Sequence, residues 1–427
     1  MRPVEMTKEQ LAEFKAEAQK KYDEYKALGL KLNMARGKPG SEQLALSKPM
    51  LDSLTAEDAA LISDDIFNYG TLDGIPEAKE LFAPMLGIPA ENVIVFGNSS
   101  LNIMYDCISR CYNFGAGEDM KPWKDQGKLK WLCPVPGYDR HFAITELFGF
   151  EMITVPMTND GPDMDMIEKL VSSDESIKGI WCVPMYANPT GITYSDETVR
   201  RMAALKPAAK DFRIFWDNAY CIHHLTDTPD KLLNLFDELK KNGSDDMAYQ
   251  FASTSKVTFP GSGVAVLGTS EANIKWVKKT MTIQTIGHDK VNMLRHVRFF
   301  GGKFENVVKH MQKHRAILEP RFNAVIDLLE KELGGTGLGS WVKPNGGYFI
   351  SFDSLDGCAK RIVALCKEAG VTLTGAGATY PYGKDPADKN IRIAPTFPPI
   401  DELIKAMEVF VTAVKLASAE KLLSAAN

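Results

Sequence analysis

Five apolar runs of the chain are each followed by polar or aromatic residues that could bind a ligand or take part in catalysis. In chain order these segments are GNSSLN (97–102), PGYDRHF (136–142), PMYANPTG (184–191), DNAY (217–220) and TSK (254–256). They include the amine of Lys256, a nucleophile once its pKa is lowered, and the carboxylate of Asp217, which can hold a proton on a neighbouring base. Because open α/β sheets bind ligands beyond the carboxyl ends of their strands, we expect these segments to form one site.

The apolar runs themselves are typical of buried strands. They are VIVF (93–96), WLCPV (131–135), MITV (152–155), GIWCV (179–183), RIFW (213–216), YQFAS (249–253) and GVAVLG (263–268). Helical patterns lie between most of them, for example at 101–112 and 196–210. Strands that alternate with helices predict an α/β domain with a mostly parallel seven-stranded sheet, covered on both faces.

The two ends of the chain have a different pattern. Thr7 and Gln10 form a capping box before a helix that Gly29 can end, and residues 33–50 resemble a Gly/Pro-rich loop. Beyond residue 290 we expect a helix (303–334), a strand (347–352), a helix (356–369), short strands near 371–374 and 390–394, and a final helix from about 400. The prediction is a large domain over 51–295 and a smaller α+β domain over 296–427, with the N-terminal helix and active-site loop, residues 1–50, packed on the smaller one.

Composition excludes several classes of protein. The 427 residues are 44% hydrophobic and 25% charged, with a net charge of −5, which argues against nucleic-acid binding. No apolar run approaches the roughly 18 residues of a membrane span, and the charged N-terminus lacks the apolar core of a signal peptide. Seven cysteines without a C-x-x-C pair argue against a disulfide framework or a zinc site. We therefore expect a cytoplasmic protein with buried thiols and no metal site.

The order of the motifs resembles one known family. Four features follow one another along the chain: Asn188-Pro189-Thr190-Gly191, Asp217-x-x-Tyr220, Ser253-x-Ser255-Lys256 and Arg392. This order resembles the fold-type I aminotransferases of class I/II, which use pyridoxal 5′-phosphate (PLP). Three segments, NMARGKPG (33–40), CPVPGYDRHF (133–142) and STSKVTFPG (253–261), resemble the type Ic aspartate aminotransferase subgroup most closely. The resemblance spans nearly the whole chain and implies the PLP-transferase type I fold and a homodimer with shared active sites.

The resemblance also implies roles for single residues around the PLP ring. Lys256 would form a Schiff base with the aldehyde and later act as general base, and Asp217 would keep the pyridine nitrogen protonated. Tyr220 and Asn188 would donate hydrogen bonds to the ring oxygen. Tyr138 would stack on the ring face.

For the phosphate, the resemblance implies a set of hydrogen-bond donors. Ser99, Ser100 and Leu101 would open a helix whose N–H groups favour an anion, and Ser253 would add a hydroxyl. Tyr69 would reach the phosphate from the neighbouring subunit. Most relatives also carry an arginine a few residues after the lysine, but Gly263 stands at that position here. A charge-assisted contact is therefore missing or supplied from elsewhere.

The substrate site follows from the same resemblance. Arg392 matches the arginine that binds the substrate α-carboxylate, with Gly37 and Asn188 in the same site. A dicarboxylic substrate needs a further cation, for which Arg36 is the first candidate and Lys290 the second. The implied reaction moves an amino group from an L-amino acid, aspartate or glutamate, to a 2-oxo acid. A PLP-dependent C–S lyase, a non-enzymatic PLP-binding regulator and an α/β enzyme without PLP remain alternatives.

Overall fold

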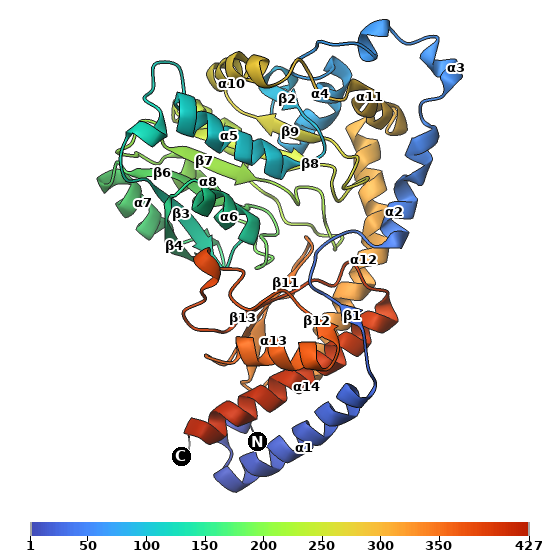
Figure 1. Ribbon diagram of the computed structural model, residues 1–427, viewed down its shortest axis with the longest axis vertical. Helices are drawn as coiled ribbons and strands as arrows, with labels where there is room; N and C mark the ends of the chain where they lie inside the picture. The colour runs from blue at the N-terminus through green and yellow to red at the C-terminus, as the bar shows by residue number, and fades with distance from the viewer. Residues whose placement is uncertain (1, 426–427) are drawn as a thin grey trace.

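The computed structural model describes residues 2–425, and its centre is an eight-stranded sheet (Figure 1). In spatial order the strands are β2 (Val93–Val95), β9 (Ala265–Gly268), β8 (Ala248–Ser253), β7 (Arg213–Asp217), β6 (Ile177–Cys182), β3 (Lys130–Val135), β4 (Glu151–Thr158) and β5 (Gly161–Pro162). The five strands from β8 to β4 are mutually parallel, whereas β9, β2 and β5 pair antiparallel. The mostly parallel α/β sheet predicted from the sequence is confirmed.

The sheet has one strand more than the seven predicted. All seven apolar runs form strands, and the eighth, β5, is a two-residue segment that pairs with Met157 and Thr158 at the end of β4. A strand of two residues shows no alternation of polar and apolar side chains, so the hydrophobic pattern could not reveal it.

Helices cover both faces of the sheet and create two of its cores. One face packs against α5 (Ser100–Phe114), α6 (Asp139–Leu147) and α10 (Glu271–Gln284). The other face packs against α7 (Met164–Ser173), α8 (Asp196–Ala203) and α9 (Leu235–Lys241). Helix α8 ends at Ala203, short of the predicted end at 210, because Pro207 follows closely and disfavours a continuing helix.

The antiparallel edge of the sheet, formed by β2 and β9, is covered by a third group of helices. They are α4 (Pro76–Phe82), α11 (Lys290–Phe299) and the start of α12 (Phe304–Leu333), while the short helix α3 (Ala56–Ala59) lies further out (Figure 1). Apart from α3, these helices contribute buried side chains to a common core with β2 and β9. Helix α12 then runs from this edge to the second sheet of the molecule (Figure 1).

The second sheet is small and antiparallel. Its strands are β10 (Gly339–Trp341), β11 (Ile350–Ser354) and β13 (Asn390–Ile393), and α13 (Ala359–Glu368) and α14 (Ile400–Ala425) pack nearby. Helix α1 (Lys8–Ala27) lies along α14 (Figure 1), and the Tyr22 hydroxyl donates to the Leu365 carbonyl at 2.9 Å. The short strands β1 (Leu32–Asn33) and β12 (Val371–Thr372) pair in parallel as a separate two-stranded sheet. The N-terminal segment is therefore tied to the C-terminal part of the chain by helix packing and by strand pairing.

The N-terminal segment corrects one prediction. The capping box of Thr7 and Gln10 is present, but the expected loop over 33–50 contains helix α2 (Ser41–Ser47), followed by a 3₁₀ turn. The side chain of Gln43 accepts a hydrogen bond from the backbone N–H of Gly40 at 3.1 Å and so caps α2. The prediction of a loop gave the flanking Gly and Pro residues too much weight and overlooked this cap.

Three properties of residues 2–425 bear on function. No helix in this range is both long and apolar enough to cross a membrane. Nor does the range contain a group of three or more His, Cys, Asp or Glu side chains arranged to hold a metal ion. All seven cysteines are free thiols, and six of them are buried.

Candidate active site

A cavity of about 520 Å³ opens at the carboxyl ends of the central strands, between them and the small sheet. Twelve of the fourteen candidate site residues named from the sequence line it. They are Arg36, Gly37, Ser99, Ser100, Leu101, Tyr138, Asn188, Asp217, Tyr220, Ser253, Lys256 and Arg392. The structure therefore brings together residues that are up to about 350 positions apart in the sequence.

Asp217 ends strand β7 and lies at the base of the cavity. Its side chain is nearly fully buried, and His141 Nε2 donates to its Oδ2 at 2.9 Å. The His141 ring is itself stacked on Trp181, with 4.3 Å between ring centroids and 11° between planes. The other oxygen, Oδ1, is buried without a hydrogen-bond partner. A buried acceptor of this kind is costly unless a ligand donates to it.

Lys256 follows strand β8 and faces two aromatic rings. Its Nζ lies 5.2 Å from the ring centroid of Tyr220 and 5.7 Å from that of Tyr348. Burial lowers the pKa of the Lys256 ammonium group, and the charge of Asp217 opposes this only in part. Burial raises the pKa of the Tyr220 phenol well above its usual value, so this hydroxyl stays a donor. Lys256 is thus favoured as a neutral, nucleophilic amine.

Tyr138 and Asn188 complete the walls around Asp217 and Lys256. Tyr138 immediately precedes α6, and burial raises the pKa of its phenol to about 12, assisted by the nearby charge of Asp217. Asn188 follows β6, is nearly fully buried, and precedes a cis peptide bond to Pro189.

Hydroxyl groups gather where α5 begins. Ser99 caps this helix by accepting the N–H of Asn102 at 3.3 Å. The Ser253 hydroxyl donates to Ser255 Oγ at 3.1 Å, and Ser255 in turn donates to the carbonyl of Asn98 at 3.1 Å. The first N–H groups of a helix have no intrahelical acceptor, so this corner of the cavity suits an anion.

Gly263 stands where the resemblance to the aminotransferases led us to expect an arginine, and its surroundings leave no room for a side chain. A Cβ added there would lie 2.8 Å from Thr254 Oγ1 and 3.0 Å from the Phe259 carbonyl oxygen. Gly263 also does not line the cavity. Any cation at this anion site must therefore come from another part of the structure.

Arg392 reaches the cavity from strand β13 of the small sheet. Its Nη1 donates to Asp139 Oδ1 at 3.0 Å and to Asn188 Oδ1 at 3.3 Å, and its Nη2 donates to Thr374 Oγ1 at 3.4 Å. Its Nε is buried without a partner. The guanidinium group thus contacts Asp139 and Asn188 on the side of the large sheet and Thr374 after β12, and its Nε remains an unused donor.

The ring of Phe349 supports this guanidinium group, whose Cζ lies 4.8 Å from the ring centroid. Gly37 passes so close to the same ring that an added Cβ would lie 2.4 Å from Phe349 Cζ. Only glycine therefore allows the N-terminal segment to close over the aromatic ring beneath Arg392.

Other lining residues were not singled out from the sequence. Asp139 and Arg140 line the cavity, and His141 lies behind Asp217 in a smaller neighbouring pocket. All three belong to the segment PGYDRHF, in which only Tyr138 was expected to take part in the site. Their position in a motif directly after a strand was the available signal. Phe349 and Thr374 also line the cavity, and they lie in segments that carried no motif.

Tyr69 and Lys290 do not line the cavity. Tyr69 is 81% exposed. The ammonium group of Lys290 donates to the backbone carbonyls of Asp65 and Tyr69, the latter at 3.4 Å. Lys290 therefore holds the segment that carries Tyr69 and does not face the cavity.

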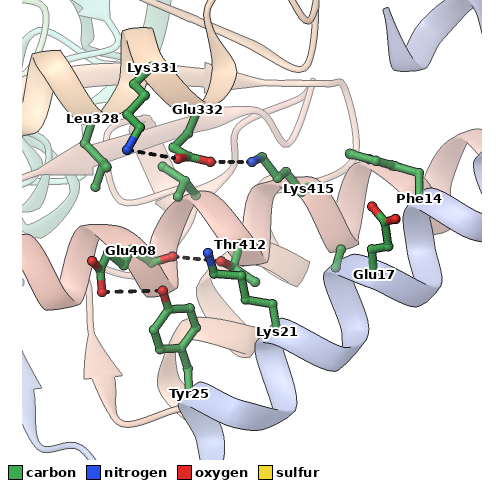
Figure 2. A pocket seen from close by; sticks show the side chains of 12 residues that line it. Phe14, Glu17, Lys21, Tyr25, Leu328, Lys331, Glu332, Glu408, Thr412 and Lys415 are labelled. Carbon is green, nitrogen blue, oxygen red and sulfur yellow. Dashed lines mark hydrogen bonds and ion pairs between the residues drawn. The ribbon is translucent and has the colours of Figure 1, made fainter. Parts of the chain in front are cut away.

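A second pocket lies between α1, α12 and α14 (Figure 2). Several of its charged side chains are paired with one another. Lys415 contacts Glu332 at 2.6 Å, and the Tyr25 hydroxyl donates to Glu408 at 3.4 Å. None of the expected site residues lines this pocket.

Comparison with known proteins decides the family. The family model described as aspartate amino-transferase matches residues 6–426. The chain belongs to this aminotransferase family. An aspartate aminotransferase of Corynebacterium glutamicum is 46% identical over 96% of this chain and 95% of its own. A crystal structure of an aspartate transaminase from the same species superposes with a TM-score of 0.95, at 45% identity and 99% coverage of both chains.

A more distant structure shows the shared fold. LysN, an α-aminoadipate aminotransferase of Thermus thermophilus, was solved with N-(5′-phosphopyridoxyl)-L-leucine, and it is 18% identical with a TM-score of 0.71 over 93% of both chains. The protein is an aminotransferase enzyme of the PLP-transferase fold, and its cofactor is PLP. The cavity fits this cofactor because the buried Asp217 oxygen lacks a donor and the amine of Lys256 is favoured in its neutral form.

Proposed function

We propose that this aminotransferase exchanges an amino group between a dicarboxylic L-amino acid, aspartate or glutamate, and a 2-oxo acid. The observation that carries the proposal is the charge of the cavity. Four cationic side chains line it, those of Arg36, Lys38, Arg140 and Arg392, against the two carboxylates of Asp139 and Asp217, whereas the amine of Lys256 is favoured in its neutral form. A phosphate and a dicarboxylic substrate would together balance this excess. The names of the Corynebacterium relatives support the same substrate class.

In this proposal four residues hold the cofactor ring. PLP supplies an electron sink when it is bound, provided that its ring nitrogen is protonated. Asp217 Oδ1 would accept that N–H, while His141 fixes the other oxygen of the carboxylate. Tyr220 would donate to the ring oxygen together with Asn188. Tyr138 would cover one ring face.

Lys256 would be both the amine that attaches the cofactor and the group that moves the proton. Burial lowers the pKa of its ammonium group, so Nζ is available to take the proton from the substrate Cα. Tyr220 and Tyr348 flank Nζ and limit its movement. This placement serves proton transfer because the amine must stay within reach of one carbon atom.

The phosphate would bind where α5 begins. Ser99, Ser100 and Leu101 would offer donors of the helix start, and Ser253 a hydroxyl. Tyr69 would come from a second subunit, because in its own subunit it is exposed and distant from the cavity lining. We therefore also propose a homodimer with shared active sites.

The substrate would be held at two ends. Arg392 would bind the α-carboxylate, and the ring of Phe349 would hold its guanidinium group in place. Gly37 lets the N-terminal loop pack directly against the same ring. The distal carboxylate would bind to Arg36 or Arg140. Both line the cavity, and their side chains are exposed.

Two further proposals concern the compartment of the protein and its division into domains. The free, mostly buried cysteines support a reducing compartment such as the cytoplasm. The contact between α1 and α14 supports the assignment of residues 1–50 to the smaller domain, with the large domain over 51–295 and the small one over 296–427.

The test is substrate kinetics of Arg36→Ala and Arg140→Ala, with Arg200→Ala on the surface of α8 as control. The variant that loses the distal contact should raise KM for aspartate and glutamate by about tenfold or more, with little change for alanine. The control should match the wild type for all three substrates. Equal effects on aspartate and alanine in both variants would contradict the proposed substrate class.

A further inference from the structure

The guanidinium group of Arg392 already has a carboxylate partner within the protein. Asp139 Oδ1 accepts from Nη1 at 3.0 Å, whereas the other acceptors, Asn188 and Thr374, are neutral and more distant. An Arg fork binds a carboxylate most strongly when two of its N–H groups point at the two oxygens. Asp139 accepts from only one N–H group of Arg392, so this ion pair lacks the stronger two-bond geometry.

The contact between Asp139 and Arg392 can break without burying an unpaired carboxylate. It is the first residue of α6, on the large-sheet side, while Arg392 belongs to the small sheet, so the ion pair spans the cavity. The carboxylate of Asp139 is 35% exposed, and Arg392 is its only hydrogen-bonding or ion-pair partner within residues 2–425. Because water can reach this side chain, its charge can be solvated as soon as the contact breaks. Arg392, in contrast, is 7% exposed and held by Phe349.

We propose that Asp139 is a built-in competitor that occupies Arg392 until the α-carboxylate of a substrate displaces it. The inference rests on the proposed role of Arg392. Every amino acid and every 2-oxo acid carries this carboxylate, so the competition weakens the binding of all substrates alike and favours product release. It is therefore a determinant of affinity and not of side-chain choice.

The opposite role would be that of a positioning residue, in which Asp139 stays bound and orients Arg392. The two roles predict opposite changes in carboxylate affinity when Asp139 is replaced. Loss of a competitor strengthens carboxylate binding, whereas loss of a positioning contact weakens it.

The experiment compares Asp139→Asn and Asp139→Ala with the wild type. KM for aspartate, alanine and 2-oxoglutarate should fall together, by about fivefold, as expected for a partly exposed ion pair. The dissociation constant of succinate, measured by calorimetry on the cofactor-loaded enzyme without amino acid, should fall by the same factor. Unchanged or increased constants in both variants would overturn the inference.

Two controls keep the result specific. Asp196→Asn removes the first-turn carboxylate of α8, far from the cavity, and should leave both constants unchanged, so a general effect of losing a helix N-terminal charge is recognised. In an Arg392→Gln background, Asp139→Asn should no longer lower KM. If Arg392→Gln alone leaves KM for alanine unchanged, the proposed role of Arg392 fails, which is distinct from failure of the competition.

Discussion

Acid should destabilise this protein through histidines that fold in the neutral form, and His314 on α12 offers the clearest case. Gln43 Nε2 donates to His314 Nδ1 at 3.1 Å and to the Tyr348 hydroxyl at 2.7 Å, while its Oε1 accepts from Gly40. His314 Nε2 lies 3.1 Å from His310 Nε2. A proton on His314 Nδ1 would therefore oppose the amide N–H of Gln43. Burial lowers the pKa of His314 to about 3, assisted by the charge of His310.

The sign and size of the effect follow from linkage. An unfolded histidine has a pKa of about 6.5, so below this pH the unfolded chain binds a proton that the folded chain excludes. The free energy of unfolding therefore decreases as the pH falls. Between pH 7.5 and 5.5 the contribution of one such group is about 1.4 kcal/mol.

Equilibrium urea unfolding of wild type and His314→Gln at pH 7.5, 6.5 and 5.5, at one protein concentration and with saturating PLP, measures this contribution. The variant should be less stable at pH 7.5, but its stability should decrease by about 1.4 kcal/mol less on going to pH 5.5. Lys313→Gln, on the exposed side of the same helix turn, should keep the wild-type slope. If wild type and His314→Gln lose the same free energy over this range, His314 is not held neutral and the reasoning is refuted.

Two further predictions concern the cavity, and a third concerns the buried surroundings of Gly263. Asp217→Asn should lower kcat of transamination about a hundredfold or more while the protein stays folded, because the amide cannot hold a proton on the cofactor ring. In steady-state assays, an activity within a few-fold of the wild type would contradict this prediction. Gly37→Ala should raise KM for amino acids about tenfold and leave the absorbance of bound PLP unchanged, because its Cβ meets the Phe349 ring; an unchanged KM would mean that the loop adjusts freely. Gly263→Ala should reduce the free energy of unfolding by about 1–3 kcal/mol in urea titrations, because the added Cβ would lie 2.8 Å from Thr254 Oγ1. A free energy of unfolding equal to that of the wild type would show that the backbone relaxes around the new methyl group.

Much of the fold could be predicted because the central strands are continuous apolar runs bounded by turns. Each of the seven runs forms a strand. Strand β5 was not predicted, because two residues are too few to show an alternation of polar and apolar side chains. Helix α2 was not predicted for a different reason. Its cap depends on the Gln43 side chain returning to Gly40, an interaction that a Gly/Pro-rich composition hides.

The candidate site was predictable where a residue type is tied to its chemistry and to a motif. Lys256 and Asp217 belong to this class, and both line the cavity. His141 and Asp139 do not, because their importance lies in contacts with residues distant in sequence, Asp217 and Arg392. Contacts of this kind are set by the tertiary packing of α6 between the two sheets and leave no local pattern.

The most direct measurement of the central claim is to find which amine carries PLP. Treatment of the purified, PLP-loaded enzyme with borohydride fixes the cofactor to the amine it has joined, and peptide mass spectrometry then locates it. We expect one modified peptide, with the phosphopyridoxyl group on Lys256, and no modification in Lys256→Ala. A group on another lysine, or unchanged labelling and activity in Lys256→Ala, would contradict it.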